Sequence, residues 1–290
     1  MENTPKSRRM LIASMAIFGT LAPFVRNIPL PSGELALYRA LLAALLIGGF
    51  LIATKQKIHL KSIGRELPVL LFSGIAIGIN WILLFEAYKY TSVSVATLSY
   101  YFAPVIVTVV CPFLFREKLT LRQLVCFFMS TVGLVLVIGI GEIGSDSRGL
   151  IGVLFGLGAA AFYATVIILN KFIRGVAGIH RTLLQFLSAI AVLIPYVAFS
   201  GGFSLGTLNP TGWICLLIVG LIHTGITYCL YFSALKDLPG QEAAILSYID
   251  PLVAIGVSVL ILKESMSVTQ LIGGILILGF TILNEIRPAS

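Results

Sequence analysis

The chain consists of long apolar runs separated by short polar loops. Runs without Asp, Glu, Lys or Arg include Leu67–Phe85, Val93–Phe115, Gln123–Gly141, Gly149–Asn170 and Ser265–Asn284. A helix needs about 20 mostly apolar residues to cross the hydrocarbon core of a bilayer. The pattern therefore predicts an all-α integral membrane protein with ten transmembrane helices. We place them at residues 10–28, 34–54, 67–88, 93–115, 120–140, 149–170, 181–199, 211–234, 241–262 and 266–284.

The second half of the chain repeats the pattern of the first half in a single register. Ala96–Gln123 resembles Ala243–Gln270 at an offset of 147 positions, which aligns Tyr101 with Tyr248. Other aligned pairs are Gly78 with Gly225, Trp81 with Tyr228, Phe85 with Phe232 and Glu117 with Glu264. An offset of about half the chain indicates two copies of one unit and not a solenoid of many repeats.

The formal net charge of +8 is distributed over the loops between the apolar runs. A nucleic-acid-binding protein gathers its charge on one face or arm, so this pattern argues against nucleic acid as a partner. With the N-terminus in the cytoplasm, 15 Lys and Arg residues fall on the cytoplasmic side and 4 on the external side. The positive-inside rule then predicts an integral cytoplasmic-membrane protein with both termini cytoplasmic.

Composition supports a membrane location. Hydrophobic residues make up 58% of the chain and charged residues 11%, whereas a soluble domain carries roughly 25% charged residues. The four cysteines stand singly within apolar runs without the spacing of metal ligands, which favours a packing role and no metal site. They are Cys111, Cys126, Cys215 and Cys229.

Five spans per copy is an odd number, so the second copy enters the membrane inverted relative to the first. We predict a first five-helix repeat at 1–141, an external linker at 142–148 and a second repeat at 149–290. Inverted repeats are common in secondary transporters, whose substrate site lies between the repeats.

Several segments resemble EamA-type carriers of the drug/metabolite transporter superfamily. FEAYKYTSVSVATLSYYFAPVIV followed by REKLTLRQ resembles the first copy, ELALYRALLAALL its second helix, and KESMSVTQLIGGILILGF the second copy. The resemblance implies that helices 1–4 and 6–9 surround a central cavity and that helices 5 and 10 lie at the edge. One departure is Cys126, where the family leads us to expect a small glycine. The family includes exporters of amino acids and other metabolites.

These observations predict a secondary active transporter and not an enzyme. We expect it to export a small polar or zwitterionic, amino-acid-like metabolite by alternating access, without a cofactor; proton coupling and a homodimer are left open. A sugar-phosphate-type exchanger is an alternative, but it needs mid-membrane Lys or Arg for phosphate, and Arg39 alone lies within a span and not at its end. An intramembrane enzyme is a further alternative, although no HExxH-like signature is present in the sequence.

Two ionisable residues near the middle of predicted helices are candidates for substrate binding or coupling. Asp250 stands where the first copy has Ala103, and His223 stands where it has Ala76. Ionisable groups at this depth are costly and face the protein interior or water. Asp250 either binds a cation or a proton, or ties helices together. His223 either relays a proton or hydrogen-bonds across helices.

Two prolines and a polar pair complete the candidates. Pro104 and Pro251 are expected to kink their helices and to free carbonyl groups near the mid-membrane. Arg39 and Glu86 lie at similar depths on helices 2 and 3, which predicts an ion pair that serves as a gate or as a structural bridge. The other candidate lining residues are Tyr100, Tyr101, Tyr248, Ser247, Trp81, Tyr163 and Asn170.

Overall fold

A computed structural model describes the protein at residues 4–56, 64, 66–115, 120–138, 147–170, 172–173, 175–176, 178–235, 238, 243 and 246–285. Within these residues the regular structure is helical and contains no strand. The helices are α1 (Thr4–Gly19), α2 (Leu21–Arg26), α3 (Ser32–Ala53), α5 (Leu67–Tyr90), α6 (Val93–Tyr100), α7 (Ala103–Phe115), α8 (Leu121–Ile138), α9 (Ser147–Asn170), α10 (Gly178–Phe199), η1 (Leu205–Thr207), α11 (Pro210–Leu217), η2 (Ile218–Ile226), α12 (Thr227–Leu235), α14 (Ile249–Leu260) and α15 (Val268–Glu285).

Seven helices of the described chain are long and apolar enough to cross a membrane. They are Pro5–Arg26, Ser32–Ala53, Leu67–Tyr90, Val93–Cys111, Arg148–Asn170, Gly178–Phe199 and Pro210–Ala234. Three shorter apolar helices occupy Leu121–Val137, Ile249–Leu260 and Val268–Asn284. By length and composition, seven of the ten predicted spans therefore qualify, and shorter apolar helices occupy the other three positions.

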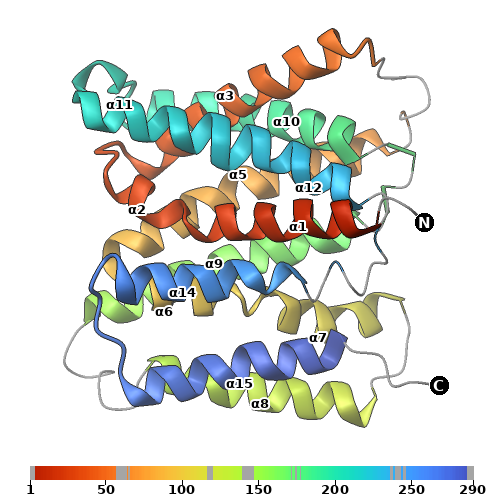
Figure 1. Ribbon diagram of the computed structural model, residues 1–290, viewed down its shortest axis with the longest axis vertical. Coiled ribbons are helices and arrows are strands. Elements are labelled where there is room, and N and C mark those ends of the chain that lie inside the picture. Colours follow the sequence, from red (N-terminus) through yellow and green to blue (C-terminus); the bar gives the residue numbers. More distant parts are fainter. Residues whose placement is uncertain are drawn as a thin grey trace.

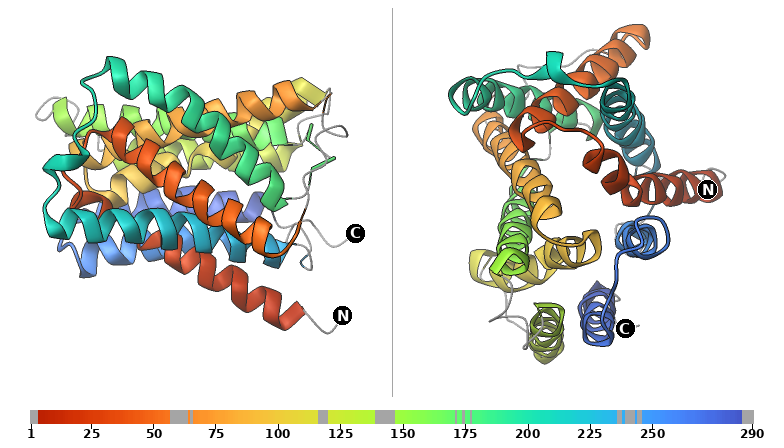
Figure 2. Two further views of the ribbon diagram at one scale, coloured as in Figure 1. Left: turned by 90° about the horizontal axis from the view of Figure 1, so that it is seen from above. Right: turned by 90° about the vertical axis from the view of Figure 1, so that its left-hand side faces the viewer.

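The long helices run side by side, and the start of α1 and the end of α15 lie at the same end of the bundle (Figure 1). The end of α2 and the start of α6 lie at the opposite end, which we call the Arg26 end. Helices α8 and α15 pack against each other at one edge of the bundle, where they border α6 and α7 (Figure 2). This is the position that the family resemblance implies for helices 5 and 10.

Glycines allow α8 and α15 to approach closely. A Cβ atom on Gly133 would lie 2.6 Å from the carbonyl oxygen of Gly273, and one on Gly273 would lie 2.4 Å from that of Gly133. Small residues at such contacts let two helix backbones meet in a membrane. Cys126, the position in the first copy that matches Gly273, is buried on α8, and it is Gly133 of that helix that lies against Gly273.

Helix α3 packs against α5, α10 and η2 along one side. Its buried residues include Leu37, Arg39, Ala40 and Ala43. Gly220 of η2 lies directly against α3, because a Cβ atom there would be 2.6 Å from the Cβ of Leu42. This contact holds η2 beside the middle of α3 and brings polar side chains of η2 close to Arg39.

Several helices are interrupted near the middle of the bundle. A turn at Thr20 separates α1 from α2. A second turn, at Tyr101–Phe102 just before Pro104, separates α6 from α7. Helix α14 begins at Ile249, two residues before Pro251. Both prolines thus lie in the first turn of a helical segment, where the missing N–H costs no hydrogen bond. The predicted kinks are interruptions of the helix at these positions.

Candidate functional site

Four tyrosines from two helices and two interhelical turns pack together within the bundle. Tyr100 stacks on Tyr163 of α9 with ring centroids 5.1 Å apart. Tyr101 meets Tyr100 edge-on at 5.6 Å and lies 6.5 Å from Tyr248. We call these four residues the tyrosine cluster. All four were expected to line a cavity, and the structure brings them together from both halves of the chain.

Asp250 joins this cluster through a short hydrogen bond. The hydroxyl of Tyr101 donates to Oδ2 of Asp250 at 2.5 Å. The main chain at Asp250 lies against the end of α1, because a Cβ atom on Gly19 would be 2.6 Å from the carbonyl oxygen of Asp250. The Tyr101 hydroxyl comes from the first half of the chain and the carboxyl group from the second. An acid so placed can hold either a proton or a cationic group.

His223 lies on η2, a nine-residue π-helix, and contacts the break between α1 and α2. Its Nε2 lies 3.1 Å from Oγ1 of Thr20, and its Nδ1 lies 3.4 Å from the carbonyl oxygen of Ile218. The imidazole also packs against Phe24 at 5.0 Å. His223 and Asp250 therefore meet the α1–α2 break at successive residues, Thr20 and Gly19, and the described contacts contain no direct bond between them.

Arg39 does not pair with Glu86, contrary to the sequence-based expectation. Its Nε donates to Oγ1 of Thr224 at 2.6 Å, whereas the carboxylate of Glu86 binds Lys89 at 3.0 Å. Successive residues of a helix point about 100° apart. Phe85 is 1% exposed and faces the interior beside Arg39, so the next residue, Glu86, turns away from the guanidinium.

The guanidinium of Arg39 lies among aromatic rings. Its central carbon is 4.5 Å from the ring centroid of Trp81 and 5.6 Å from that of Phe85. Trp81 in turn contacts Phe186 at 5.3 Å, and Phe186 contacts Tyr228 at 5.3 Å. Cation–π contacts of this kind stabilise a desolvated arginine. Trp81, a candidate lining residue, thus supports Arg39.

Three tyrosines lie near both Arg39 and Asp250. Tyr88, Tyr100 and Tyr228 are each within electrostatic reach of both groups. In the described part of the chain, Arg39 and Asp250 form no ion pair with each other. The site therefore presents a basic group and an acidic group that are not paired, with phenol groups near both.

Two candidate lining residues have other partners. Oδ1 of Asn170 accepts a hydrogen bond from Gln185 at 2.9 Å, and the same Gln185 amide donates to Ser73 at 2.7 Å. This group ties α9, α10 and α5 together. The hydroxyl of Ser247 donates to the carbonyl oxygen of Ala243 at 2.8 Å. The structure therefore does not bring Asn170 into the tyrosine cluster.

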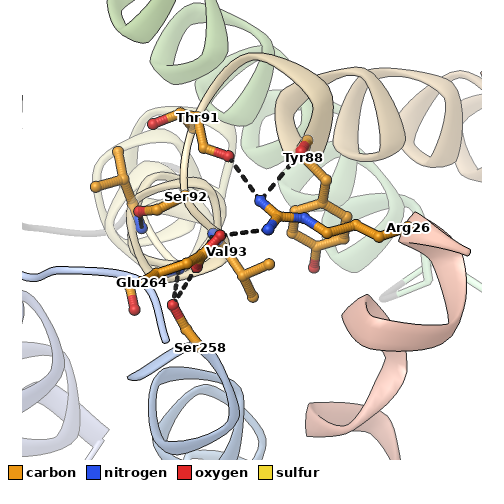
Figure 3. A network of polar contacts seen from close by, with 9 residues as sticks. Arg26, Tyr88, Thr91, Ser92, Val93, Ser258 and Glu264 are labelled. Atoms are coloured by element: carbon orange, nitrogen blue, oxygen red, sulfur yellow. Dashed lines mark hydrogen bonds and ion pairs between the residues drawn. The ribbon is translucent and has the colours of Figure 1, made fainter. Parts of the chain in front are cut away.

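A network at the Arg26 end joins the two halves of the chain (Figure 3). Nη1 of Arg26 pairs with Oε1 of Glu264 at 2.5 Å. Nη2 of Arg26 donates to the carbonyl oxygens of Thr91 at 3.2 Å and Tyr88 at 3.4 Å. Arg26 therefore fastens the end of α2 to the end of α5 and to the segment that follows α14.

Glu264 completes the network from the other side. Its Oε2 accepts a hydrogen bond from the backbone N–H of Val93 at 2.9 Å and another from the hydroxyl of Ser258. A cavity of about 790 Å³ opens at this end, and both Arg26 and Glu264 line it. Sequence reasoning missed this network. The alignment of Glu264 with Glu117 is a signal that singles out Glu264, whereas the sequence marks Arg26 only as a loop cation.

Thr224 and Thr20 were also missed. Thr224 lies on the π-helix η2, where its hydroxyl accepts a hydrogen bond from Arg39 and donates to the carbonyl oxygen of Val219 five residues earlier at 2.8 Å. A π-helix has no simple sequence signature, and it occurs frequently at functional sites.

Comparisons with known proteins give matches over most of the chain. The model of the EamA-like transporter family matches two segments, residues 9–139 and 150–285. The uncharacterized transporter YxxF of Bacillus subtilis (strain 168) is 32% identical over 280 residues, which cover 96% of this chain and 88% of the relative. Protein PecM of Dickeya dadantii (strain 3937) is 25% identical, covering 90% of this chain and 86% of the relative.

A solved crystal structure has the same fold. Its TM-score is 0.64 at 17% sequence identity, and the superposition covers 97% of this chain and 96% of that chain.

Proposed function

The chain belongs to the EamA-like transporter family, and from this premise we propose that it exports a small polar or zwitterionic, amino-acid-like metabolite across the cytoplasmic membrane by alternating access. The family assignment makes it a membrane transporter. The substrate class, the direction and the mechanism are the content of the proposal. The proposal assumes the architecture that the family resemblance implies, two inverted five-helix repeats around a central cavity.

The observation that carries the proposal is the hydrogen bond between Tyr101 and Asp250. It connects the two halves of the chain at the tyrosine cluster, near breaks in three helices. Interrupted helices that meet between repeats form the substrate sites of many secondary transporters. A carboxyl group there attracts the ammonium group of a metabolite, while the phenol rings accommodate its uncharged part.

Asp250 also offers a simple basis for proton coupling. A single carboxylate binds a proton or an ammonium group, and not both at once. Competition for one acid converts a proton gradient into movement of the substrate in the opposite direction. The hydrogen bond from Tyr101 orients the carboxyl group for either ligand. On this proposal, Asp250 is the coupling residue of a proton-linked exporter.

The Arg26–Glu264 network supplies the barrier on one side of the site. It ties α2, the α5–α6 turn and the segment after α14 to one another. The charge bias assigns this end to the external face. In alternating access, these contacts break when the site opens outward and re-form when it opens to the cytoplasm.

Flux measurements in proteoliposomes test the proposal. Purified protein is reconstituted, and the uptake of radiolabelled L-amino acids is followed with and without a pH gradient. We expect the wild type to transport at least one of them and to respond to the gradient. Asp250→Asn should keep the fold, because the amide is nearly isosteric, and should abolish the flux or its response to pH.

Glu86→Gln is the matched control. It also neutralises a carboxylate, but one that pairs with Lys89 away from the tyrosine cluster. This variant should transport like the wild type. An Asp250→Asn protein with the wild-type rate and the same pH response would show that the carboxyl group has only a structural role.

A further inference from the structure

Arg39 is a buried cation for which the structure provides no anion. Its side chain lies on α3, seven residues or about 10 Å below the Arg26 end of that helix. The residue is 3% exposed. Across the described residues, no carboxylate lies within ion-pair distance of its guanidinium. A charge placed at such a depth in a membrane protein is costly and marks a functional site by default.

The part of the guanidinium best suited to bind an anion is available. Thr224 occupies Nε, and the rings of Trp81 and Phe85 lie 4.5 and 5.6 Å from the central carbon. The described hydrogen bonds leave the terminal nitrogens, Nη1 and Nη2, without a protein acceptor. These two nitrogens form the fork that binds a carboxylate through two parallel hydrogen bonds. The surroundings thus fix the orientation of the group while leaving its binding edge unused.

The two acids that could neutralise Arg39, Glu86 and Asp250, have other partners. Glu86 is adjacent in sequence to Phe85, yet it turns outward and pairs with Lys89. Asp250 binds Tyr101, and three tyrosines lie within electrostatic reach of both charged groups. If the two charges served only the fold, pairing them would be the less costly arrangement. Their separation instead leaves one binding site for each end of a zwitterion.

We propose that Arg39 binds the carboxylate of the transported metabolite while Asp250 binds its amine. The substrate class is therefore a zwitterion with a free carboxylate and a free amine, as in an α-amino acid. The inference rests on the proposed function, since it names the substrate of the same site. It further assigns Thr224 as the residue that positions the guanidinium, and Trp81 as its aromatic support.

Trp81 provides a direct reporter for this proposal. The chain contains two tryptophans, and the second, Trp213, is 39% exposed on α11, far along the sequence from the site. In a Trp213→Phe background, the emission of Trp81 reports on the cation 4.5 Å from its ring. The purified full-length protein is titrated with L-amino acids, with the carboxamide of each, and with the matched amines and carboxylates.

Binding of the probes that carry a carboxylate should depend on Arg39, and binding of the probes that carry an amine should depend on Asp250. We expect amino acids to change the emission saturably, and their amides and amines to require at least tenfold higher concentrations. Arg39→Lys keeps the charge but loses the fork, so it should weaken the binding of amino acids and plain carboxylates at least tenfold and leave that of amines unchanged. Asp250→Asn should weaken the binding of amines and amino acids and leave that of plain carboxylates unchanged.

Thr224→Val and Thr224→Ser form a second pair of variants, for use if Arg39→Lys fails to fold. Valine should weaken the binding of carboxylates, and serine, which keeps the hydroxyl, should restore it. Amides that bind as tightly as the amino acids, or carboxylate binding that does not depend on Arg39 and Thr224, would overturn the role of Arg39. The transport function would stand in that case if flux still depended on Asp250. The absence of both a saturable response and flux across the whole panel would overturn the two proposals together.

Discussion

The hydroxyl of Tyr101 is the hydrogen-bond donor that the structure gives to the carboxyl group of Asp250. Tyr101→Phe removes this donor without changing the ring. A buried polar group that loses its partner costs about 1–3 kcal/mol. We therefore expect a lower thermal midpoint and a reduced flux in proteoliposomes. Tyr248→Phe, the equivalent substitution in the second half, is the control and should have the smaller effect on flux. Equal effects of both substitutions would argue against a specific role for the Tyr101–Asp250 bond.

Sequence reasoning located Asp250 because of an asymmetry between the two copies. An acid that stands opposite Ala103 in the repeat alignment is not required by the shared fold. The same reasoning misplaced the partner of Arg39, because it used depth in the membrane without rotation about the helix axis. Helix α5 is apolar on nearly every side, so the pattern of polar and apolar residues does not reveal which side faces the interior. Only the packed structure shows that Phe85 and not Glu86 faces Arg39.

At the scale of elements, the contact between α8 and α15 depends on two glycines. Gly273→Val places a side chain where even a Cβ atom would be 2.4 Å from the carbonyl oxygen of Gly133. The helices must separate, and overpacking of this kind costs roughly 1–3 kcal/mol. We expect a lower thermal midpoint in detergent. Gly279→Ala lies on the same helix with no atom near the added group, so it should be neutral or stabilising. Equal losses in both variants would contradict a specific contact at Gly273.

The elements themselves differ in how far the sequence specifies them. Long, mostly apolar stretches predicted α3 and α5 within about two residues of their observed ends, since length and hydropathy decide such helices. The two prolines marked the interruptions in α6–α7 and before α14. The break at Thr20 and the π-helix η2 were not predicted. Both depend on contacts between distant segments, such as Thr20 with His223, that no local pattern encodes.

For the whole molecule, orientation in the membrane is the expectation on which the direction of transport depends. The 15-to-4 distribution of Lys and Arg places Gln56 in the cytoplasm and Thr207 outside. Both residues are exposed, so a cysteine at either position should react freely with a thiol reagent. In a cysteine-free background, an impermeant reagent added to intact cells should label Thr207→Cys and leave Gln56→Cys unlabelled until the membrane is permeabilised. The reverse pattern would invert the orientation and, with it, the assignment of the Arg26 end to the external face.

The Arg26–Glu264 network predicts how the whole molecule responds when one contact between its halves is weakened. Glu264→Gln and Arg26→Gln each remove the ion pair, whose side chains are 14% and 31% exposed. Both variants should shift the population toward states that are open at the Arg26 end. Ser94 reports on this opening, because it is 2% exposed and its N–H contacts Ser258 within the network.

Ser94→Cys in the cysteine-free protein should therefore react slowly with a thiol reagent, and several-fold faster when combined with either variant. Glu86→Gln is the control, because it removes the pair with Lys89 on one turn of α5, and in the described contacts this pair joins no other element. This control should leave the labelling rate unchanged. If the Arg26 and Glu264 variants label no faster than the control, the network stabilises the fold without closing the site, and the barrier of the transport cycle lies elsewhere at this end.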